Sequence, residues 1–358
     1  MSYFTVKLKD LSLIKTGKLD SNEAVSGGTY PFFTCDPNTL RINNWAYDTE
    51  AVLLAGNNAS GNYTAKYYNG KFNAYQRVYI IETADRSRLN TRYLCYAMNQ
   101  QLQLLKTMSS GSTTKFLTLG MLHGLDIPLP AIADQDKIVS VLSVYDDLIE
   151  NNQKQIKLLE EAAQRLYKEW FIDLRFPGHE TTPIVDGIPQ GWENASVTDL
   201  LEIRYGKDHK GLADGCIPVY GSGGIMRKVD KILYSGESVL IPRKGSLNNI
   251  LLVSGDFWTI DTMFYSVPKR PNVAKYVYLY LTGIDMYAMN IGAAVPSMTV
   301  KILDGMRLLC PSDSILELFE TTAKPYYEMI ELLKKKQSML GETRDRLLPK
   351  LMSGEIEV

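Results

Sequence analysis

Two long segments of the chain carry apolar residues at spacings that alternate between four and three positions. The first series runs unbroken over residues 138–170, and the second lies 181 positions later, over residues 319–351. Such spacing places the apolar side chains in one seam along a helix, as in a coiled coil. The pattern predicts two long helices, one at 134–172 and one, with a C-terminal tail, at 313–358.

Two residues disturb the second seam. Arg344 puts a charge into its last third and weakens the apolar pattern there. Pro325 lies near its start, and proline has no amide hydrogen to donate and a ring that clashes with the preceding turn. We therefore predict that the second helix is kinked in its first turns or truly begins later.

The remaining apolar segments are short and alternate with turn-forming residues. Clusters of Gly, Asn, Asp and Ser separate them, which is typical of strands joined by tight loops. We predict β-rich regions over residues 1–133 and 194–312, with a linker rich in Pro and Gly at 173–193. Examples of the predicted strands are residues 51–54, 78–81, 238–241 and 263–267.

The two halves of the chain repeat one another. Residues 6–18 match residues 195–207, with Gly17 over Gly206 at an offset of 189. Later matches keep their order while the offset falls in steps of two to 181. Because chance similarity would not keep its order, the repeat indicates a duplication whose halves differ by small loop deletions.

The repeat and the two seams together define the predicted fold class. Each half is a β-rich domain followed by a long helix, which is an α+β arrangement. Each helix, with about 34 residues, extends roughly 50 Å, longer than one β-rich domain needs. We therefore predict that the helices pair as an antiparallel coiled coil with pseudo-twofold symmetry. In that register paired residue numbers add to 489, which places Asn152 opposite Gln337 as an amide pair that fixes the register.

The net charge of −1 hides an uneven distribution. Residues 1–133 carry 13 basic and 9 acidic side chains, and residues 194–312 carry 13 and 10. The predicted helices and the linker are acidic on balance. Basic blocks that alternate with acidic connectors favour a nucleic-acid partner for the β-rich regions.

Composition narrows the class of protein further. No apolar run reaches the roughly 18 residues of a membrane span, and the first ten residues do not resemble a signal peptide. The four cysteines form no C-x-x-C pair, so neither a zinc site nor a disulfide framework is indicated. We expect a cytoplasmic protein that binds no metal.

A search for catalytic motifs finds none. The glycine-rich string Y-G-S-G-G-I at 220–225 lacks a third glycine and a following helix pattern, so we interpret it as a tight turn. Neither a phosphate-binding ATPase loop nor the N-P-P-[YF] string of amino-methyltransferases occurs. Asp199, Asp208 and Lys210 faintly resemble the ligands of a metal-dependent nuclease, without the strand context that such a site needs. We expect no catalytic residue.

Polar loops recur at matched positions of the repeat. Asn side chains can bond adenine in the major groove, Arg or Lys can bond guanine, and hydroxyls and Lys can reach phosphates. The alternative is that these are ordinary solvated turns. The candidate DNA-binding residues are Asn57, Asn58, Ser60, Asn62 and Lys66, then Ser112, Thr113, Thr114 and Lys115, then Arg243, Lys244, Ser246, Asn248 and Asn249, and finally Ser297, Thr299 and Lys301.

Taken in order, several strings resemble the specificity subunit of type I restriction–modification systems over essentially the whole chain. They include Y-P-F-F-T at 30–34, G-K-F-N-A-Y-Q-R at 70–77, L-P-A-I-A-D-Q-D-K-I at 129–138, I-P-Q-G-W at 188–192, D-F-W-T-I-D-T at 256–262 and R-D-R-L-L-P-K-L-M-S-G-E-I at 344–356. The first half departs from the second, with F-T-C-D at 33–36 in place of Y-G-S-G.

This resemblance implies a non-catalytic, DNA-binding subunit. Residues 1–133 and 194–312 would be target-recognition domains, each reading one half of a bipartite site in double-stranded DNA, with the helices as a ruler. Two modification subunits would dock and methylate adenine with S-adenosylmethionine, and restriction subunits would bring ATP- and Mg-dependent cleavage. This chain would bind no cofactor itself.

Two other classes of function remain open. A coiled-coil adaptor whose β-rich heads bind proteins would show no salt-sensitive DNA binding, even with partners present. A stand-alone nuclease would need Asp199, Asp208 and Lys210, and would cleave DNA with Mg²⁺. The bases read and the length of the spacer do not follow from the sequence.

Overall fold

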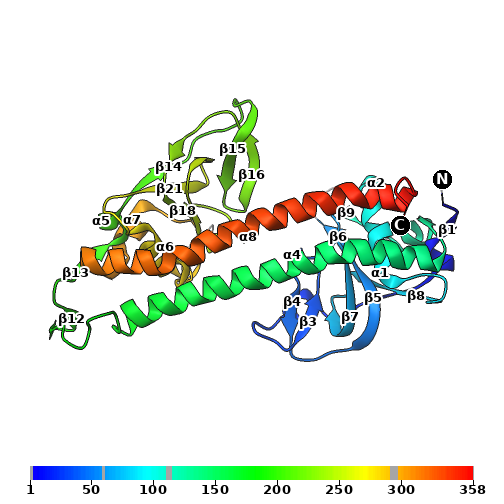
Figure 1. The fold of residues 1–358 in the computed structure, drawn as a ribbon, viewed down its shortest axis with the longest axis horizontal. Coiled ribbons are helices and arrows are strands. Elements are labelled where there is room, and N and C mark those ends of the chain that lie inside the picture. Colours follow the sequence, from blue (N-terminus) through cyan, green and yellow to red (C-terminus); the bar gives the residue numbers. More distant parts are fainter. Residues whose placement is uncertain (1–2, 59–60, 110–114, 291–296, 358) are drawn as a thin grey trace. The chain divides into compact units, whose positions relative to one another are not determined.

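The structure is a computed structural model that describes residues 3–58, 61–109, 115–290 and 297–357. It consists of two compact units. Unit 1 comprises Met1–Gln153 and Lys335–Val358, and unit 2 comprises Lys154–Lys334. Each unit combines one β-rich head with a stretch of both long helices, which confirms the predicted α+β class (Figure 1). Within the described residues, no helix is both long enough and apolar enough to cross a membrane.

The head of unit 1 is built on a six-stranded sheet (Figure 1). All neighbouring strands are antiparallel except β3 and β7, which run parallel. The strand order is β2 (Ser12–Thr16), β8 (Val78–Thr83), β5 (Tyr47–Ala55), β7 (Ala65–Ala74), β3 (Tyr30–Phe33) and β4 (Leu40–Ile42). Two small ribbons pair β1 (Thr5–Lys7) with β10 (Asp126–Pro128) and β6 (Asn57–Asn58) with β9 (Lys115–Phe116). The short helices are η1 (Leu8–Asp10), η2 (Ser21–Glu23), α1 (Thr91–Gln100), α2 (Leu102–Met108) and α3 (Leu119–His123).

The head of unit 2 repeats this plan with its sheet divided in two. One half has the order β14 (Leu201–Tyr205), β21 (Met263–Pro268), β18 (Ser238–Pro242) and β19 (Leu251–Val253). The other has the order β16 (Gly224–Val229), β15 (Asp214–Gly221), β20 (Asp256–Thr259) and β17 (Tyr234–Ser235). Two ribbons pair β13 (Glu193–Ser196) with β22 (Arg307–Cys310) and β11 (Ile184–Val185) with β12 (Ile188–Pro189). The short helices are α5 (Val197–Leu200), α6 (Ala274–Thr282), η4 (Ala288–Asn290) and α7 (Val300–Gly305).

Backbone hydrogen bonds confirm the duplication. The amide of Gly17 donates to the Val78 carbonyl at 3.1 Å, and the amide of Gly206 donates to the Met263 carbonyl at 3.2 Å. Both glycines are required by the close approach of another strand. A Cβ on Gly17 would lie 2.2 Å from the Ala74 oxygen, and one on Gly206 would lie 2.0 Å from the Ile260 oxygen. The glycine that follows the first strand of each sheet is therefore held by equivalent backbone contacts in the two heads.

The heads differ where one long strand of unit 1 becomes two in unit 2. Strand β7 is continuous for ten residues, whereas β19 and β20 are separated at Gly255. Gly70 occupies the equivalent place in β7, and both glycines have a positive φ, of 131° and 95°. A side chain rarely adopts this conformation, so the kink is retained in both heads. Only in unit 2 does it end the strand.

The two long helices have the lengths that the seams indicate. Helix α4 spans Ile132–Tyr167 and continues into a π-helical turn, η3 (Lys168–Ile172), while α8 spans Asp313–Ser353. In unit 2 the rings of Trp170 and Phe319, whose numbers add to 489, lie 5.8 Å apart. In unit 1 Arg344 Nη1 lies 2.8 Å from Asp146 Oδ1, a pair whose numbers add to 490. The antiparallel pairing is confirmed within each unit.

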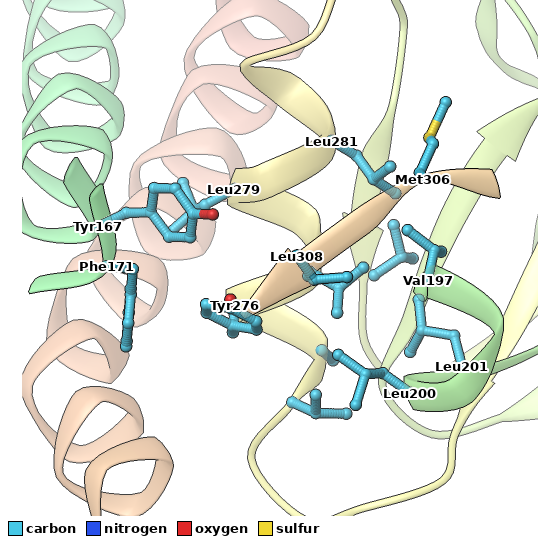
Figure 2. Close-up of a cluster of buried hydrophobic side chains, with 14 of the residues drawn as sticks. Tyr167, Phe171, Val197, Leu200, Leu201, Tyr276, Leu279, Leu281, Met306 and Leu308 are labelled. Atoms are coloured by element: carbon cyan, nitrogen blue, oxygen red, sulfur yellow. The ribbon is translucent and has the colours of Figure 1, made fainter. Parts of the chain in front are cut away.

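The seam residues join the cores of the heads. In unit 1, Ile138 and Leu142 of α4 and Leu351 of α8 are buried in the same cluster as the inner face of α1. In unit 2 the end of α4 contacts α6 (Figure 2), where the rings of Phe171 and Tyr276 lie 4.7 Å apart. Each head therefore shares its hydrophobic core with the helix pair.

Two predictions about the seam need correction. Helix α8 begins at Asp313 and continues through Pro325, so the prediction of a later start is wrong. The proline lies on the exposed side, where water can solvate the carbonyl that it leaves unpaired, while Phe319 and Ala323 are fully buried on the other side. Arg344 does not merely weaken the seam, because Asp146 of α4 balances its charge.

The expected amide pair also differs from the structure. Asn152 is buried, with 7% of its surface exposed, but Gln337 does not bond to it. Gln337 Nε2 donates instead to the Ile149 carbonyl at 3.1 Å and to Gln153 Oε1 at 3.2 Å. The Gln side chain is one methylene longer than Asn and reaches the backbone of the neighbouring helix. A role of Asn152 and Gln337 in setting the register stays a prediction.

Candidate nucleic-acid interface

In each head the two predicted polar loops lie together at one end of a central strand. In unit 1 the Leu117 amide donates to the Gly56 carbonyl at 2.8 Å, just after β5. In unit 2 the Met298 amide donates to the Arg243 carbonyl at 2.9 Å, just after β18. These bonds are equivalent under the repeat. Loops that are about 60 residues apart in the sequence are thus brought into one surface of each head.

The loop of unit 1 is held by its own amide side chains. Asn57 Oδ1 accepts a hydrogen bond from the Cys35 thiol at 2.6 Å, and burial raises the pKa of that thiol, so it remains a donor. Asn58 Oδ1 accepts from the Asn62 amide at 3.1 Å. Lys106 Nζ donates to Asn62 Oδ1 at 2.7 Å. These oxygens therefore shape the loop.

The basic residues of this loop are Lys66 and Lys115. Lys66 Nζ donates to Thr39 Oγ1 at 3.2 Å, and burial lowers the pKa of its amine. Lys115 lies on β9, directly opposite Asn58, and is half-buried. Both cations are therefore partly enclosed by the head. Ser60, Ser112, Thr113 and Thr114, which the sequence also singled out, lie outside the described residues.

Two candidate residues of unit 2 hold neighbouring loops in place. Asn248 Nδ2 donates to Asp285 Oδ1 at 3.0 Å, and its Oδ1 accepts from the Met286 amide at 2.8 Å. Asn249 Nδ2 donates to the Ser222 carbonyl at 2.8 Å. These bonds tie the loop after β18 to the turn of the β15–β16 hairpin and to the segment after α6. The two amides serve the architecture of the surface.

The other candidates of unit 2 are more varied. Thr299 caps α7 by accepting from the Ile302 amide at 3.2 Å, as Thr118 does for α3 in unit 1. Lys244, Ser246 and Lys301 are exposed, and Ser297 is half-buried. The exposed cations are available to a charged partner. Thr299 has a structural role that its repeat partner shares.

Arg243 is oriented by three groups. Its Cζ lies 4.7 Å from the ring centre of Tyr205 and 5.1 Å from that of Phe264. Its Nη1 donates to the Asp261 carbonyl at 2.7 Å. A cation over two aromatic faces with one end bonded has little rotational freedom. Arg243 is thus the most firmly placed charge among the described candidates of this loop.

The sequence did not single out the aromatic and hairpin residues around Arg243. Tyr205 is 55% exposed, and Ile225 and Met226 next to the hairpin turn are 61% and 56% exposed. The string Y-G-S-G-G-I forms that turn, as interpreted, with Gly224 at φ 108°. Tyr205 lies inside the repeat motif at 195–207, directly before Gly206, and this position was the available signal.

The nuclease interpretation finds no support in the geometry. Asp199 Oδ2 accepts from the Ser196 amide at 2.7 Å and caps α5, and these bonds hold the pKa of its carboxyl below the usual range. Asp208 Oδ1 accepts from the Lys210 amide at 3.1 Å in a local turn. Across the described ranges no group of three or more His, Cys, Asp or Glu could hold a metal ion. Each carboxylate has a local structural role.

Known proteins can now be compared with these heads. Residues 2–161 match the sequence profile of the type I restriction modification DNA specificity domain. The likeness to this domain therefore covers the first head and most of the first long helix. This confirms the resemblance found in the sequence.

Individual relatives match parts of the chain of different length. The type I restriction enzyme EcoDI specificity subunit of Escherichia coli is 36% identical over 161 residues, 45% of this chain and 35% of that protein. The MjaIX specificity subunit of Methanocaldococcus jannaschii is 28% identical over 298 residues, 74% of this chain and 68% of that protein. The chain thus spans about a third of the first relative and about two thirds of the second.

A solved structure has the same fold. The crystal structure of the type I restriction–modification S subunit from M. genitalium superposes with a TM-score of 0.59 at 19% identity, covering 98% of this chain and 96% of that one. At 19% identity this similarity shows a shared fold and nothing more. Because 98% of the chain is covered, the shared fold includes both β-rich heads and both long helices.

Proposed function

We propose that this chain is the DNA-binding specificity subunit of a type I restriction–modification complex. Each head reads one half of a bipartite site in double-stranded DNA. The helix pair sets the spacing between the half-sites and docks two methyltransferase subunits. S-adenosylmethionine belongs to those subunits, and ATP and Mg belong to the restriction subunits that complete the assembly.

One observation carries this proposal. The two heads share a hydrogen-bond framework, and that framework presents different side chains at equivalent positions. After the central strand, unit 1 has Gly56 and Asn57, whereas unit 2 has Arg243 and Lys244. A protein that reads two unrelated half-sites needs one scaffold with two different reading surfaces. The modest basicity of each head suits a subunit whose partners add further phosphate contacts.

The helix pair carries features that suit a partner protein. Val144 is 55% exposed and Leu158 is 64% exposed on α4, and Met339 is 68% exposed on α8. These apolar side chains lie outside the seam that buries Ile156 and Ile330. Partner helices could cover them as they cover the outer positions of a helical bundle. This supports docking of the methyltransferase subunits on the helices.

Exchange of one head tests the proposal. Residues 1–133 are replaced by the corresponding region of another specificity subunit, and the methylated DNA motif is sequenced in cells that also express the modification subunits. We expect one half of the motif to change while the other half and the spacing are kept. The matched control exchanges residues 194–312 and changes the other half. If both halves change together in a folded chimera, the heads do not read independently.

The coiled-coil adaptor makes a different prediction in the same cells. A chain whose heads bind proteins gives no sequence motif and no salt-sensitive affinity for DNA, even with the modification subunits present. Specific binding that falls steeply as salt rises from 50 to 200 mM, as counterion release requires, excludes it.

A further inference from the structure

The guanidinium of Arg243, whose N–H groups form a planar fork, is held in one orientation just after β18. The rings of Tyr205 and Phe264 lie against its guanidinium, and the two rings meet edge to face at 5.0 Å. The bond from Nη1 to the Asp261 carbonyl fixes rotation within the plane of the group. Most of the rotamer entropy that a flexible arginine loses on binding is therefore lost before a ligand arrives.

Arg243 also has N–H donors that make no hydrogen bond among the described residues. Among the described residues Nη2 makes no hydrogen bond, and Nε is buried with no partner. A buried donor left unpaired is costly, so such a group calls for an explanation. Nε is enclosed by the chain, so an acceptor that arrives from outside would meet the N–H donors of Nη2. The orientation of the fork and its unused donors thus point to a ligand with fixed acceptors.

We propose that Arg243 is a specificity-determining residue with which the head of unit 2 reads a guanine. This deepens the proposed function and rests on it. Guanine presents two coplanar acceptors, O6 and N7, in the major groove, and a guanidinium matches both. A phosphate would need only charge, which the exposed and flexible Lys244 next to it supplies. A fork held by two aromatic rings and bonded at one end suits an acceptor pair of fixed direction.

The head of unit 1 has no counterpart to this fork. Gly56 stands where unit 2 has Arg243, as the equivalent bonds from Leu117 and Met298 show. A Cβ on Gly56 would lie 2.5 Å from the Arg77 carbonyl oxygen and 3.0 Å from Tyr79 Cε2. The backbone of unit 1 therefore excludes any side chain there. Guanine reading by this position is confined to the half-site of unit 2.

Selection from random DNA tests the inference with the full chain, alone and together with modification subunits. We expect the wild-type motif to contain a guanine in one half, and Arg243→Met and Arg243→Lys to lose the preference for it by about 5- to 150-fold. Arg243→Lys keeps the charge but not the fork. The matched control Lys244→Ala lowers affinity on all sequences alike and keeps the motif.

A modified base gives a readout that needs no variant. Replacing that guanine by 7-deazaguanine removes N7, and we expect wild-type affinity to fall at least about fivefold. A motif without guanine in the half-site of unit 2, an unchanged preference in both Arg243 variants, or indifference to 7-deazaguanine overturns the inference and leaves the proposed function intact. If the wild type selects no motif with or without modification subunits, the proposed function itself fails, and the inference fails with it.

Discussion

The end of α8 meets the head of unit 1 through charged side chains, whereas the end of α4 meets the head of unit 2 through aromatic rings. In unit 1, Asp146 accepts from Arg344 and from the Tyr96 hydroxyl and lies 3.8 Å from Arg92. At the positions equivalent to Asp146 and Arg344, unit 2 has Tyr327 and Ala163. At these two positions an ion pair in unit 1 is therefore replaced by an aromatic and a small apolar side chain in unit 2.

One cation is retained on the helix that faces this junction, but its partners have changed. Arg92 of α1 bonds Asp147 of α4 at 2.8 Å. Lys275 of α6 bonds Glu320 of α8 at 2.7 Å and is only 6% exposed. Burial lowers the pKa of Lys275, but its bonds to the two carboxylates outweigh this, so the pKa is raised and the amine stays charged. The two junctions therefore have equivalent places in the repeat but use different side-chain partners.

The largest expected effect comes from substituting the two equivalent glycines of the heads, Gly17 and Gly206. Gly17→Ala and Gly206→Ala should each destabilise their own unit by about 3 kcal/mol or more, because the new Cβ overlaps a backbone oxygen that cannot move aside. Urea unfolding gives the loss, and hydrogen exchange assigns it to a unit. Gly223→Ala, at a turn with open space around it, is the control. A loss in one head only would show that the heads use the framework differently.

The sequence predicted this framework well, because burial leaves a periodic signal. The two seams and the repeat follow from where apolar residues must lie, and both are present in the structure. The chemistry of the loops could not be predicted in the same way. Asn248 bonds Asp285, 37 residues away, yet a loop amide has the same composition whether it binds DNA or another loop. Only the fold decides between them.

Arg344 and Pro325 show the limit for helices. A charged residue in an apolar seam looks unfavourable when its ion-pair partner is unknown. Asp146, the partner of Arg344, lies 198 residues away in the sequence. A proline in a helical pattern predicts a helix start from local rules alone. Tertiary packing can outweigh the one hydrogen bond that the proline removes, and the helix then continues through it. Local rules failed at these two places because the deciding contacts are distant in the sequence.

The aromatic junction should be stronger than its counterpart in unit 1. Phe171→Ala should destabilise unit 2 by about 3–5 kcal/mol, because the ring packs against Tyr276 at 4.7 Å and Phe319 at 4.8 Å. Met352 is the equivalent residue of unit 1, and Met352→Ala should cost about 2–3 kcal/mol. Both are measured by urea unfolding of the full chain, with Phe171→Leu as the variant that recovers part of the loss. Equal losses would contradict the proposed difference between the junctions.

The ion-pair junction makes a smaller prediction. Arg344→Ala should destabilise unit 1 by about 1–2 kcal/mol, between the values for exposed and buried pairs, because Arg344 is 30% and Asp146 27% exposed. A double-mutant cycle with Asp146→Asn should recover most of this as coupling. The control is Arg346→Ala, whose exposed side chain donates only to the Glu342 carbonyl at 3.3 Å. Coupling near zero would mean that the packing of the arginine stem stabilises the junction.

The smallest effect concerns how each head begins its first helical turn. In unit 2 the Ser196 hydroxyl accepts from the Asp199 amide at 3.1 Å, and the Asp199 carboxylate accepts from the Ser196 amide. Unit 1 has Lys7 at the equivalent position, with no side-chain cap. Ser196→Ala should therefore cost about 1 kcal/mol. Lys7→Ala is the control for the missing cap, because it removes only the exposed bonds of the Lys7 amine to Asp126 and to the Gly124 carbonyl.

The cap of unit 2 also has a pH dependence. Bonds from the backbone and hydroxyl of Ser196 hold the pKa of Asp199 below its usual value of about 4. For an acid whose pKa is depressed by folding, the added stability is present above the unfolded pKa and is lost as pH falls through the folded pKa. The protection factors of the amides at the start of α5, which are corrected for the intrinsic pH dependence of exchange, should therefore fall below about pH 4 in the wild type. In Asp199→Asn the same amides should exchange with no such acid step, and a step of unchanged size would place the responsible carboxyl elsewhere.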